Sequence, residues 1–304
     1  MISKFPDVCD IQETVQAVIG VPSATRPEIT DINYFLSRYS TKLSYYITRL
    51  NNINYSGKKV LDAGCGSGAW SIALSQCYKN VIARDLSDEG LTVFKSVLSL
   101  MDLSNIQIDK GELESLPYPD SSFDDIFCYS VIMYCDIKTV LTEFYRILNP
   151  GGRVYLCLNS DAYYDYLINE RGKLEPEQAN YGKKVMYNTL WKRFLKDSDD
   201  SKNAINQLDA TIGQWCGSEY LSAFKGDFEN YKVGKKLSIS DYETRAYTYA
   251  EIKYLVNELG YINFNCDLEG MLHLNTQNTQ VEPLYHGYYN GNITVWECVF
   301  EKPV

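Results

Sequence analysis

The stretch VLDAGCGSGA at residues 60–69 decides the fold. Its apolar first half predicts a short buried strand, and three glycines, Gly64, Gly66 and Gly68, follow at alternate positions. Glycine lets the backbone take positive φ and lets a ligand approach main-chain atoms. A helix is predicted from Ala69, so its free N–H groups would face the turn. A strand, a glycine turn and a helix in this order are typical of a site for a nucleotide-like ligand.

Two carboxylates narrow the choice of ligand. Asp62 stands two residues before the first glycine, where it would repel a pyrophosphate and attract a cationic amine. This counts against a dinucleotide, although Gly64-x-Gly66-x-x-Ala69 formally fits that fingerprint. Asp85 ends the second predicted strand, where a carboxylate can accept both hydroxyls of a ribose. A ligand with a ribose and an amine is S-adenosyl-L-methionine, which becomes S-adenosyl-L-homocysteine once its methyl group has been transferred.

Strands and helices alternate outward from this turn, which predicts an α/β protein with βαβ units and a parallel sheet. Strands are expected at about 59–63, 80–85, 106–109, 124–130, 153–158, 261–268 and 292–301, and helices at about 69–78, 88–101, 137–148 and 248–259. Residues 1–57 are predicted to be helical, with one helix from Thr30 or Asp31 to about Asn51. Residues 160–245 have no strand rhythm and are predicted to be a mostly helical insertion after strand five.

Further motifs follow in the same order as in one known family. They are GELESLPY at 111–118, FDDIFC at 123–128, ExxRILNPGG at 143–152, and YTxxEI with GY between 247 and 261. With Asp62-x-Gly64-x-Gly66-x-Gly68 and Asp85, they make residues 58–158, and more weakly 246–301, resemble the class I (Rossmann-like) S-adenosylmethionine-dependent methyltransferases. The resemblance implies a seven-stranded sheet with six parallel strands and an antiparallel last strand. Members often carry His or Glu where Met133 and Tyr134 stand here.

The resemblance also implies the cofactor site. Glu112 would accept from the adenine amino group and Leu113 would donate its backbone N–H. The N-terminal segment 1–57 would close the pocket, so the Arg38 fork and Tyr39 could reach the methionine carboxylate; the alternative is that Arg38 is a solvated helix residue. The full expected set is Arg38, Tyr39, Asp62, Gly64, Cys65, Gly66, Gly68, Trp70, Asp85, Leu86, Glu112, Leu113, Glu114, Cys128 and Tyr129.

The acceptor is expected at the carboxyl edge of the sheet, where ligands bind in open α/β folds. The insertion 160–245 and the loop at about 269–291 both leave that edge, so the insertion is interpreted as a substrate cap between the core segments 58–159 and 246–304. The alternative is a dimerisation arm or a decoration of the fold. Expected substrate-binding residues are Tyr163, Tyr187, Trp191, Trp215 and His286. His286 is also the candidate catalytic base for a hydroxyl acceptor; a solvated loop histidine is the alternative.

Composition limits the partners. The chain has 39 acidic and 29 basic residues, a net charge of −10, which is a poor match to nucleic acid. It lacks an 18-residue apolar run and an apolar signal core, so a membrane partner is not expected and a cytoplasmic location is. The nine cysteines include no CxxC pair, and no carboxylate–histidine cluster stands at ligand spacing, so no metal is expected. A homodimer is left open.

These observations predict methyl transfer from S-adenosylmethionine to oxygen or nitrogen of a small polar acceptor, such as a sugar, a peptide-like metabolite or a natural product. Two alternatives fit the same cofactor motifs: a catalytically silent regulatory protein that binds S-adenosylmethionine, and a transferase that uses a related cofactor.

Overall fold

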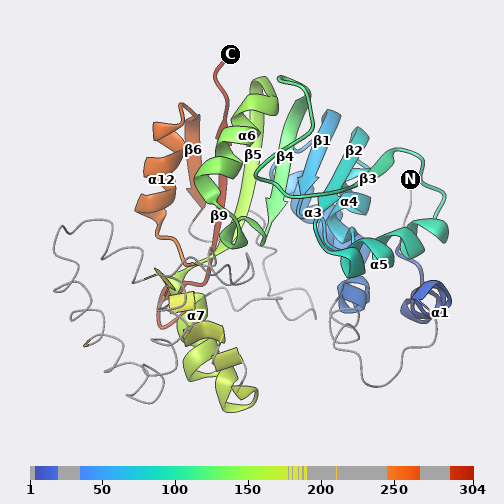
Figure 1. Cartoon of the computed structure of the whole chain (residues 1–304), viewed down its shortest axis with the longest axis horizontal. Helices are drawn as coiled ribbons and strands as arrows, with labels where there is room; N and C mark the ends of the chain where they lie inside the picture. The colour runs from blue at the N-terminus through green and yellow to red at the C-terminus, as the bar shows by residue number, and fades with distance from the viewer. Residues whose placement is uncertain are drawn as a thin grey trace, which may run out of the picture.

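A seven-stranded sheet in the order β3-β2-β1-β4-β5-β9-β6 forms the centre of the protein (Figure 1). The computed structural model describes residues 4–19, 35–176, 245–267 and 288–304, together with 178–179, 181–183, 185–186, 188–189 and 210. The strands are β1 Gly57–Ala63, β2 Tyr78–Asp85, β3 Ile106–Lys110, β4 Phe123–Tyr129, β5 Leu148–Asn159, β6 Ile262–Asp267 and β9 Val295–Glu301.

Six of these strands are parallel, because β9 runs antiparallel to both of its neighbours, β5 and β6. The predicted α/β sheet with an antiparallel last strand is therefore confirmed. The last strand is shorter than the predicted 292–301, because strand structure is interrupted at Thr294 and β9 begins at Val295. Before that break, β8 (Asn292–Ile293) pairs instead with β7 (Tyr288–Tyr289) in a separate two-stranded ribbon.

Helices cover both faces of the sheet, which explains why the central strands are apolar throughout. On one face, α1 (Val8–Ile19), α3 (Leu43–Asn52), α4 (Ala69–Leu74) and α5 (Asp88–Ser99) contribute to a common core. On the other face, α6 (Ile137–Ile147) and α12 (Tyr249–Glu258) do so. Local signals start these helices: the Ser87 hydroxyl accepts from Gly90 N–H at α5, and Thr248 and Glu251 form a capping box at α12.

The N-terminal segment differs from the prediction of one helix between about 30 and 51. Residues 35–40 are helical, Lys42 is extended (φ −65°, ψ 138°), and α3 then begins at Leu43. The Ser40 hydroxyl donates to the carbonyl of Ser37, a local bond that competes with helix continuation. The apolar period still holds across the break, since Leu36, Tyr39, Leu43, Tyr46 and Leu50 are all buried. The continuous helix was wrong, but the buried face was predicted correctly.

The insertion after β5 begins with α7 (Asp161–Asn169), followed by a 3₁₀ turn at Arg171–Lys173. Figure 1 shows α7 beyond the carboxyl end of β5, on the side of the sheet opposite to the C-terminus. The candidate residues Tyr187, Trp191, Trp215 and His286 lie outside the described residues.

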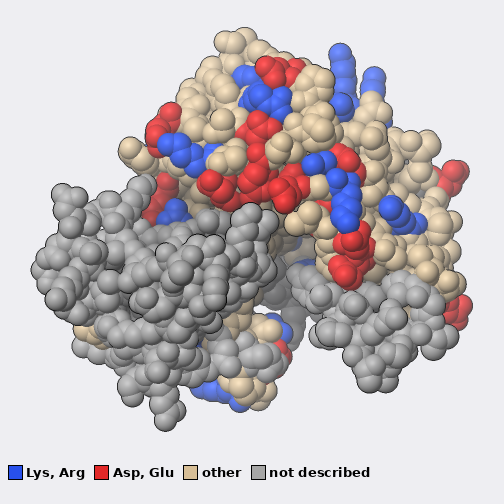
Figure 2. Space-filling view, viewed as in Figure 1, with Lys and Arg blue, Asp and Glu red and all other residues tan. Residues whose placement is uncertain are grey.

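The described surface carries both acidic and basic side chains. Figure 2 shows acidic side chains gathered across the middle of the viewed face, with Lys and Arg scattered between and around them. None of the helices in the described ranges has the length and the apolar character that a membrane span requires.

Candidate functional site

The glycine turn lies at the carboxyl end of β1 and is closely packed on both sides. All three glycines have left-handed φ, +80° at Gly64, +52° at Gly66 and +84° at Gly68. A Cβ on Gly64 would lie 2.3 Å from the side chain of Val131, and one on Gly68 would lie 2.2 Å from the ring of Phe94. Both conformation and space therefore require glycine at these two positions.

Asp85, at the carboxyl end of β2, faces this turn. Its Oδ2 accepts the N–H of Gly66 and its Oδ1 accepts the N–H of Ser87, each at 2.8 Å. Burial raises the pKa of Asp85, and these backbone donors oppose the shift. Each carboxylate oxygen has a second lone pair, so Asp85 is fixed in orientation and can still accept two further hydrogen bonds.

Asp62 lies beneath the turn at the end of β1 and is 1% exposed. Its carboxylate accepts a hydrogen bond from the hydroxyl of Ser71. Burial raises the pKa of Asp62 to about 7, and the negative charge of Asp85 adds to the shift. A cation bound nearby would favour the ionised form, so Asp62 fits a ligand that carries an ammonium group.

Arg84 fixes the loop after β3, and the sequence analysis missed it. Its Nε donates to the carbonyl of Glu112 at 3.0 Å, and its Nη1 pairs with Asp109 at 2.6 Å. A Cβ on Gly111 would lie 2.1 Å from the Arg84 guanidinium, so Gly111 leaves the space that this side chain fills. The N–H of Gly111 also donates to the carbonyl of Asp85 at 3.0 Å. The loop that begins at Glu112 is thereby held next to the end of β2.

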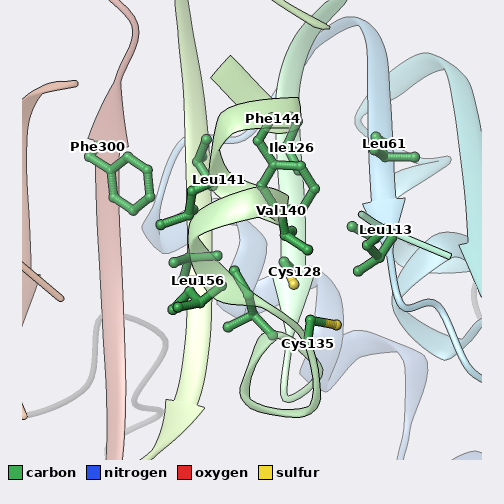
Figure 3. Packing of buried hydrophobic residues seen from close by; sticks show 14 of the residues in the cluster. Leu61, Leu113, Ile126, Cys128, Cys135, Val140, Leu141, Phe144, Leu156 and Phe300 are labelled. Carbon is green, nitrogen blue, oxygen red and sulfur yellow. The ribbon is translucent and has the colours of Figure 1, made fainter. Parts of the chain in front are cut away.

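The residues expected at the adenine have different environments. Glu112 is exposed, while the side chain of Leu113 is buried in the core on the α6 face. Glu114 Oε1 accepts the N–H of Asp136, the residue that caps α6, at 3.1 Å. Figure 3 shows that the Cys128 side chain at the end of β4 also lies in this core, close to Cys135. Leu113 and Cys128 can therefore offer a ligand only their backbone atoms, whereas Leu86 is 53% exposed.

The N-terminal segment contacts the turn directly. The buried hydroxyl of Tyr39 donates to the carbonyl of Ser67, and the Ser67 hydroxyl donates to the carbonyl of Phe35 at 3.2 Å. Arg38 is half-buried, and its carbonyl accepts from the Tyr46 hydroxyl at 3.0 Å. Cys65 is buried, and burial raises the pKa of its thiol well above the ordinary value. Tyr39 is thus engaged with the turn backbone itself.

A buried ion pair that the sequence analysis missed joins α3 to the last strand. Arg49 Nη2 lies 3.0 Å from Glu297 Oε1, and both side chains are less than 8% exposed. The hydroxyl of Tyr155 donates to the same oxygen at 3.1 Å. The Arg49 guanidinium lies 5.2 Å from the ring of Trp70 and 5.5 Å from that of Tyr129, two residues that the sequence analysis expects at the cofactor.

Part of the chain that carries this site is similar to a known protein family. Residues 61–156 match the family model described as "Methyltransferase domain". This stretch is a class I methyltransferase domain. Domains of this class take their methyl group from S-adenosylmethionine. The matched range holds the glycine turn, Asp85, Arg84 and the loop at Glu112, but not Tyr39, Arg49 or Glu297.

Relatives of named activity match part of the chain. A malonyl-[acyl-carrier protein] O-methyltransferase of Erwinia billingiae is 36% identical over 126 residues, 41% of this chain and 46% of that protein. A demethylmenaquinone methyltransferase of Geobacillus sp. is 34% identical over 108 residues, 34% of this chain and 46% of that protein. The chain thus spans about half the length of these relatives. A solved SAM-dependent methyltransferase of Methanosarcina mazei is similar with a TM-score of 0.44 and 17% identity, covering 84% of this chain and 97% of that one.

Among the residues that the structure describes, no group of three or more His, Cys, Asp or Glu side chains is arranged to hold a metal ion.

Proposed function

We propose that the whole chain is an enzyme that transfers the methyl group of S-adenosylmethionine to oxygen or nitrogen of a small polar acceptor. The observation that carries the proposal is Asp85. Two backbone N–H groups, one of them from the glycine turn, hold its carboxylate at the carboxyl end of β2, with lone pairs left for a ribose diol. A catalytic domain of matching class, residues 61–156, surrounds it.

The described residues fit this cofactor from end to end. Asp85 would hold the ribose and Asp62 would face the ammonium group. Glu112 and the backbone of Leu113 would hold the adenine, on a loop that Arg84 fixes. Bound there, S-adenosylmethionine supplies an electrophilic methyl group on a sulfonium. The chain's own part is to bind and orient both reactants, which supplies much of the rate in reactions of this kind.

The N-terminal segment would close the methionine end of the site. Its hydrogen bonds to Ser67 already place it on the turn, and Arg38 would offer its fork to the methionine carboxylate. We infer that Tyr39 acts differently from Arg38. Because the Tyr39 hydroxyl donates to the Ser67 carbonyl, Tyr39 positions the turn rather than binding the methionine carboxylate.

The acceptor would lie between the sheet edge and the insertion 160–245, where Tyr163 of α7 is a described candidate wall. Tyr187, Trp191 and Trp215 stay proposed walls and His286 stays a proposed base. By their names, the two relatives act on a malonyl-[acyl-carrier protein] and on demethylmenaquinone. Neither acceptor is a sugar or a peptide, and the two differ from each other, so the shared domain does not set the acceptor. The mixed, acidic surface in Figure 2 favours a small molecule over nucleic acid.

Calorimetric titration of S-adenosylmethionine tests the cofactor site. The variant Asp85→Ala removes two charge-assisted acceptors worth about 1.5–3 kcal/mol each, so its affinity should fall at least about 100-fold. Asp88→Ala is the matched control, because Asp88 is 73% exposed and pairs only with Lys110 at the surface. Equal affinities in the wild type and Asp85→Ala would refute the cofactor assignment. Methylated products from labelled cofactor and a metabolite extract, found by mass spectrometry, would separate the enzyme from a silent binding protein.

A further inference from the structure

Three buried oxygen atoms lack a hydrogen-bond partner in the described part of the chain. They are Asn159 Oδ1, the Tyr164 hydroxyl and Asp165 Oδ1. All three belong to one stretch, from the last residue of β5 to the middle of α7. An unpaired buried polar atom costs about 1–3 kcal/mol, and such atoms are rare in folded proteins. Three of them in so short a stretch indicate a place built to receive a ligand.

This stretch lies beside the cofactor end of the site. Asn159 is 4% exposed and ends β5 at the carboxyl edge, two residues beyond Cys157, the last residue of β5 that pairs with β4. The chain leaves β4 through Ser130, which has a left-handed φ of 58°, and Val131 packs against Gly64 of the glycine turn. Adjacent strands are about 4.8 Å apart, and β4 lies between β5 and β1, so two strand spacings, about 10 Å, separate the end of β5 from the strand that ends at the turn.

Tyrosine side chains from three elements surround Tyr164. The Tyr181 hydroxyl donates to that of Tyr134 at 3.4 Å, and the rings of Tyr163 and Tyr181 lie 5.3 and 6.2 Å from that of Tyr164. Burial raises the pKa of Tyr164 well above its ordinary value, the neighbouring Tyr134 adds to the shift, and the polar side chains of Asn159 and Tyr181 nearby oppose it. The Tyr164 hydroxyl therefore stays protonated at neutral pH and can donate as well as accept.

We propose that Asn159 and Tyr164 form the acceptor subsite of this methyltransferase, and that the subsite takes an aromatic ring bearing a hydroxyl or amino group. The inference rests on the proposed function. Asn159 Oδ1 can only accept, so its missing partner is an O–H or N–H group. A carboxylate acceptor would place oxygen against oxygen there. The surrounding tyrosine rings favour a flat apolar body on the same molecule.

In the transfer, the acceptor's lone pair forms the new bond to the methyl carbon. The carbon–sulfur bond breaks with its electron pair left on sulfur, and one proton is released to solvent. By accepting the acceptor's hydrogen, Asn159 directs one lone pair of the reacting atom away from the amide. Asn159 and Tyr164 are thus acceptor-binding residues.

Phenol and benzoate serve as probes that share a phenyl ring and differ in the polar group it carries. They are used with a saturating concentration of S-adenosyl-L-homocysteine, and binding is read by saturation-transfer NMR. Wild type should bind phenol at least fivefold more tightly than benzoate. Asn159→Leu and Tyr164→Phe should each weaken phenol binding at least fivefold. Tyr145→Phe is the control, because Tyr145 packs against Tyr261 on the α12 side, away from the subsite. Benzoate binding as tightly as phenol, or unchanged phenol affinity in both variants, would overturn the proposal.

Two further readouts separate the possible failures. Calorimetry of S-adenosyl-L-homocysteine should give the same affinity in wild type and both variants. If the wild type itself fails to bind it, the proposed function fails, whatever phenol does. The melting temperature of Tyr164→Phe should stay the same or rise, because the variant removes an unpaired buried hydroxyl. A fall would mean that the hydroxyl serves the fold, and would also count against the subsite.

Discussion

The two ends of the site differ in how completely their polar atoms are paired. Around β1 and β2, Asp62, Arg84 and Asp85 all have hydrogen-bond partners, and Gly64 and Gly68 leave no room for a Cβ. Around β5 and α7, three buried oxygens have none. The domain match ends at residue 156, and the unpaired stretch begins at Asn159. The paired end lies within the matched domain, whereas the three unpaired oxygens lie just beyond it, at the end of β5 and in α7.

Breaking the buried ion pair between Arg49 and Glu297 should have the largest effect, because the pair joins α3 to β9. Arg49→Met leaves Glu297 charged and buried, which should lower the free energy of unfolding by about 3–5 kcal/mol in denaturant titration. The control is Lys138→Met, which breaks the exposed pair with Glu258 and should cost about 0–1 kcal/mol. Similar losses in the two variants would show that Arg49 does not hold the structure together.

A methyl group added to the glycine turn should have the next largest effect. Gly68→Ala combines a left-handed φ with a Cβ 2.2 Å from Phe94, and should cost about 2–5 kcal/mol of unfolding free energy. Gly291→Ala is the matched control: φ is +77°, but nothing lies within 4 Å of its Cβ, so only about 1–2 kcal/mol of strain is expected. Equal costs would mean that packing around the turn is loose, against the comparison drawn above.

The pH dependence of cofactor affinity should show the smallest effect. Asp62 has a raised pKa of about 7 in the free protein, and a bound ammonium group favours its ionised form. Binding must therefore expel a proton below pH 7, so affinity should fall up to about tenfold per pH unit as pH drops and stay level above pH 8. Calorimetry in buffers of different ionisation enthalpy measures this proton release directly.

Asp62→Asn cannot release that proton, so its affinity should be weaker at pH 8 and nearly independent of pH. Any dependence that remains would belong to Asp85, whose pKa is also raised by burial. If the variant keeps the full dependence of the wild type, Asp62 does not face the ammonium group.

Sequence reasoning predicted what local chemistry determines. The order of strands and helices follows from the apolar period and the glycine turn, and Asp62 and Asp85 follow from their distance to that turn. The long helix between 30 and 51 was wrong because the extended Lys42 interrupts it, while the apolar spacing continues past the interruption. Period alone cannot detect such a break.

Contacts between distant segments could not be predicted in this way. Arg49 and Glu297 are 248 positions apart, and each is an ordinary charged residue in its own segment. Arg84 gave a faint signal, because it is a charged residue directly after the apolar run at 81–83 of β2. Asn159 gave none, because a polar residue at a strand end is usual and only the three-dimensional structure shows that its oxygen is unpaired.

The position of Trp70 gives the protein a built-in optical reporter. Its indole follows the glycine turn by two residues and lies 4.7 Å from the ring of Tyr46, 4.9 Å from that of Phe127 and 5.2 Å from the Arg49 guanidinium. The emission of an indole depends on the charges and rings beside it. A ligand that binds at the turn and shifts the N-terminal segment changes those neighbours, and the emission of Trp70 changes with them. The part of the fluorescence change that is lost in Trp70→Phe is therefore the part that reports binding, and no added label is needed.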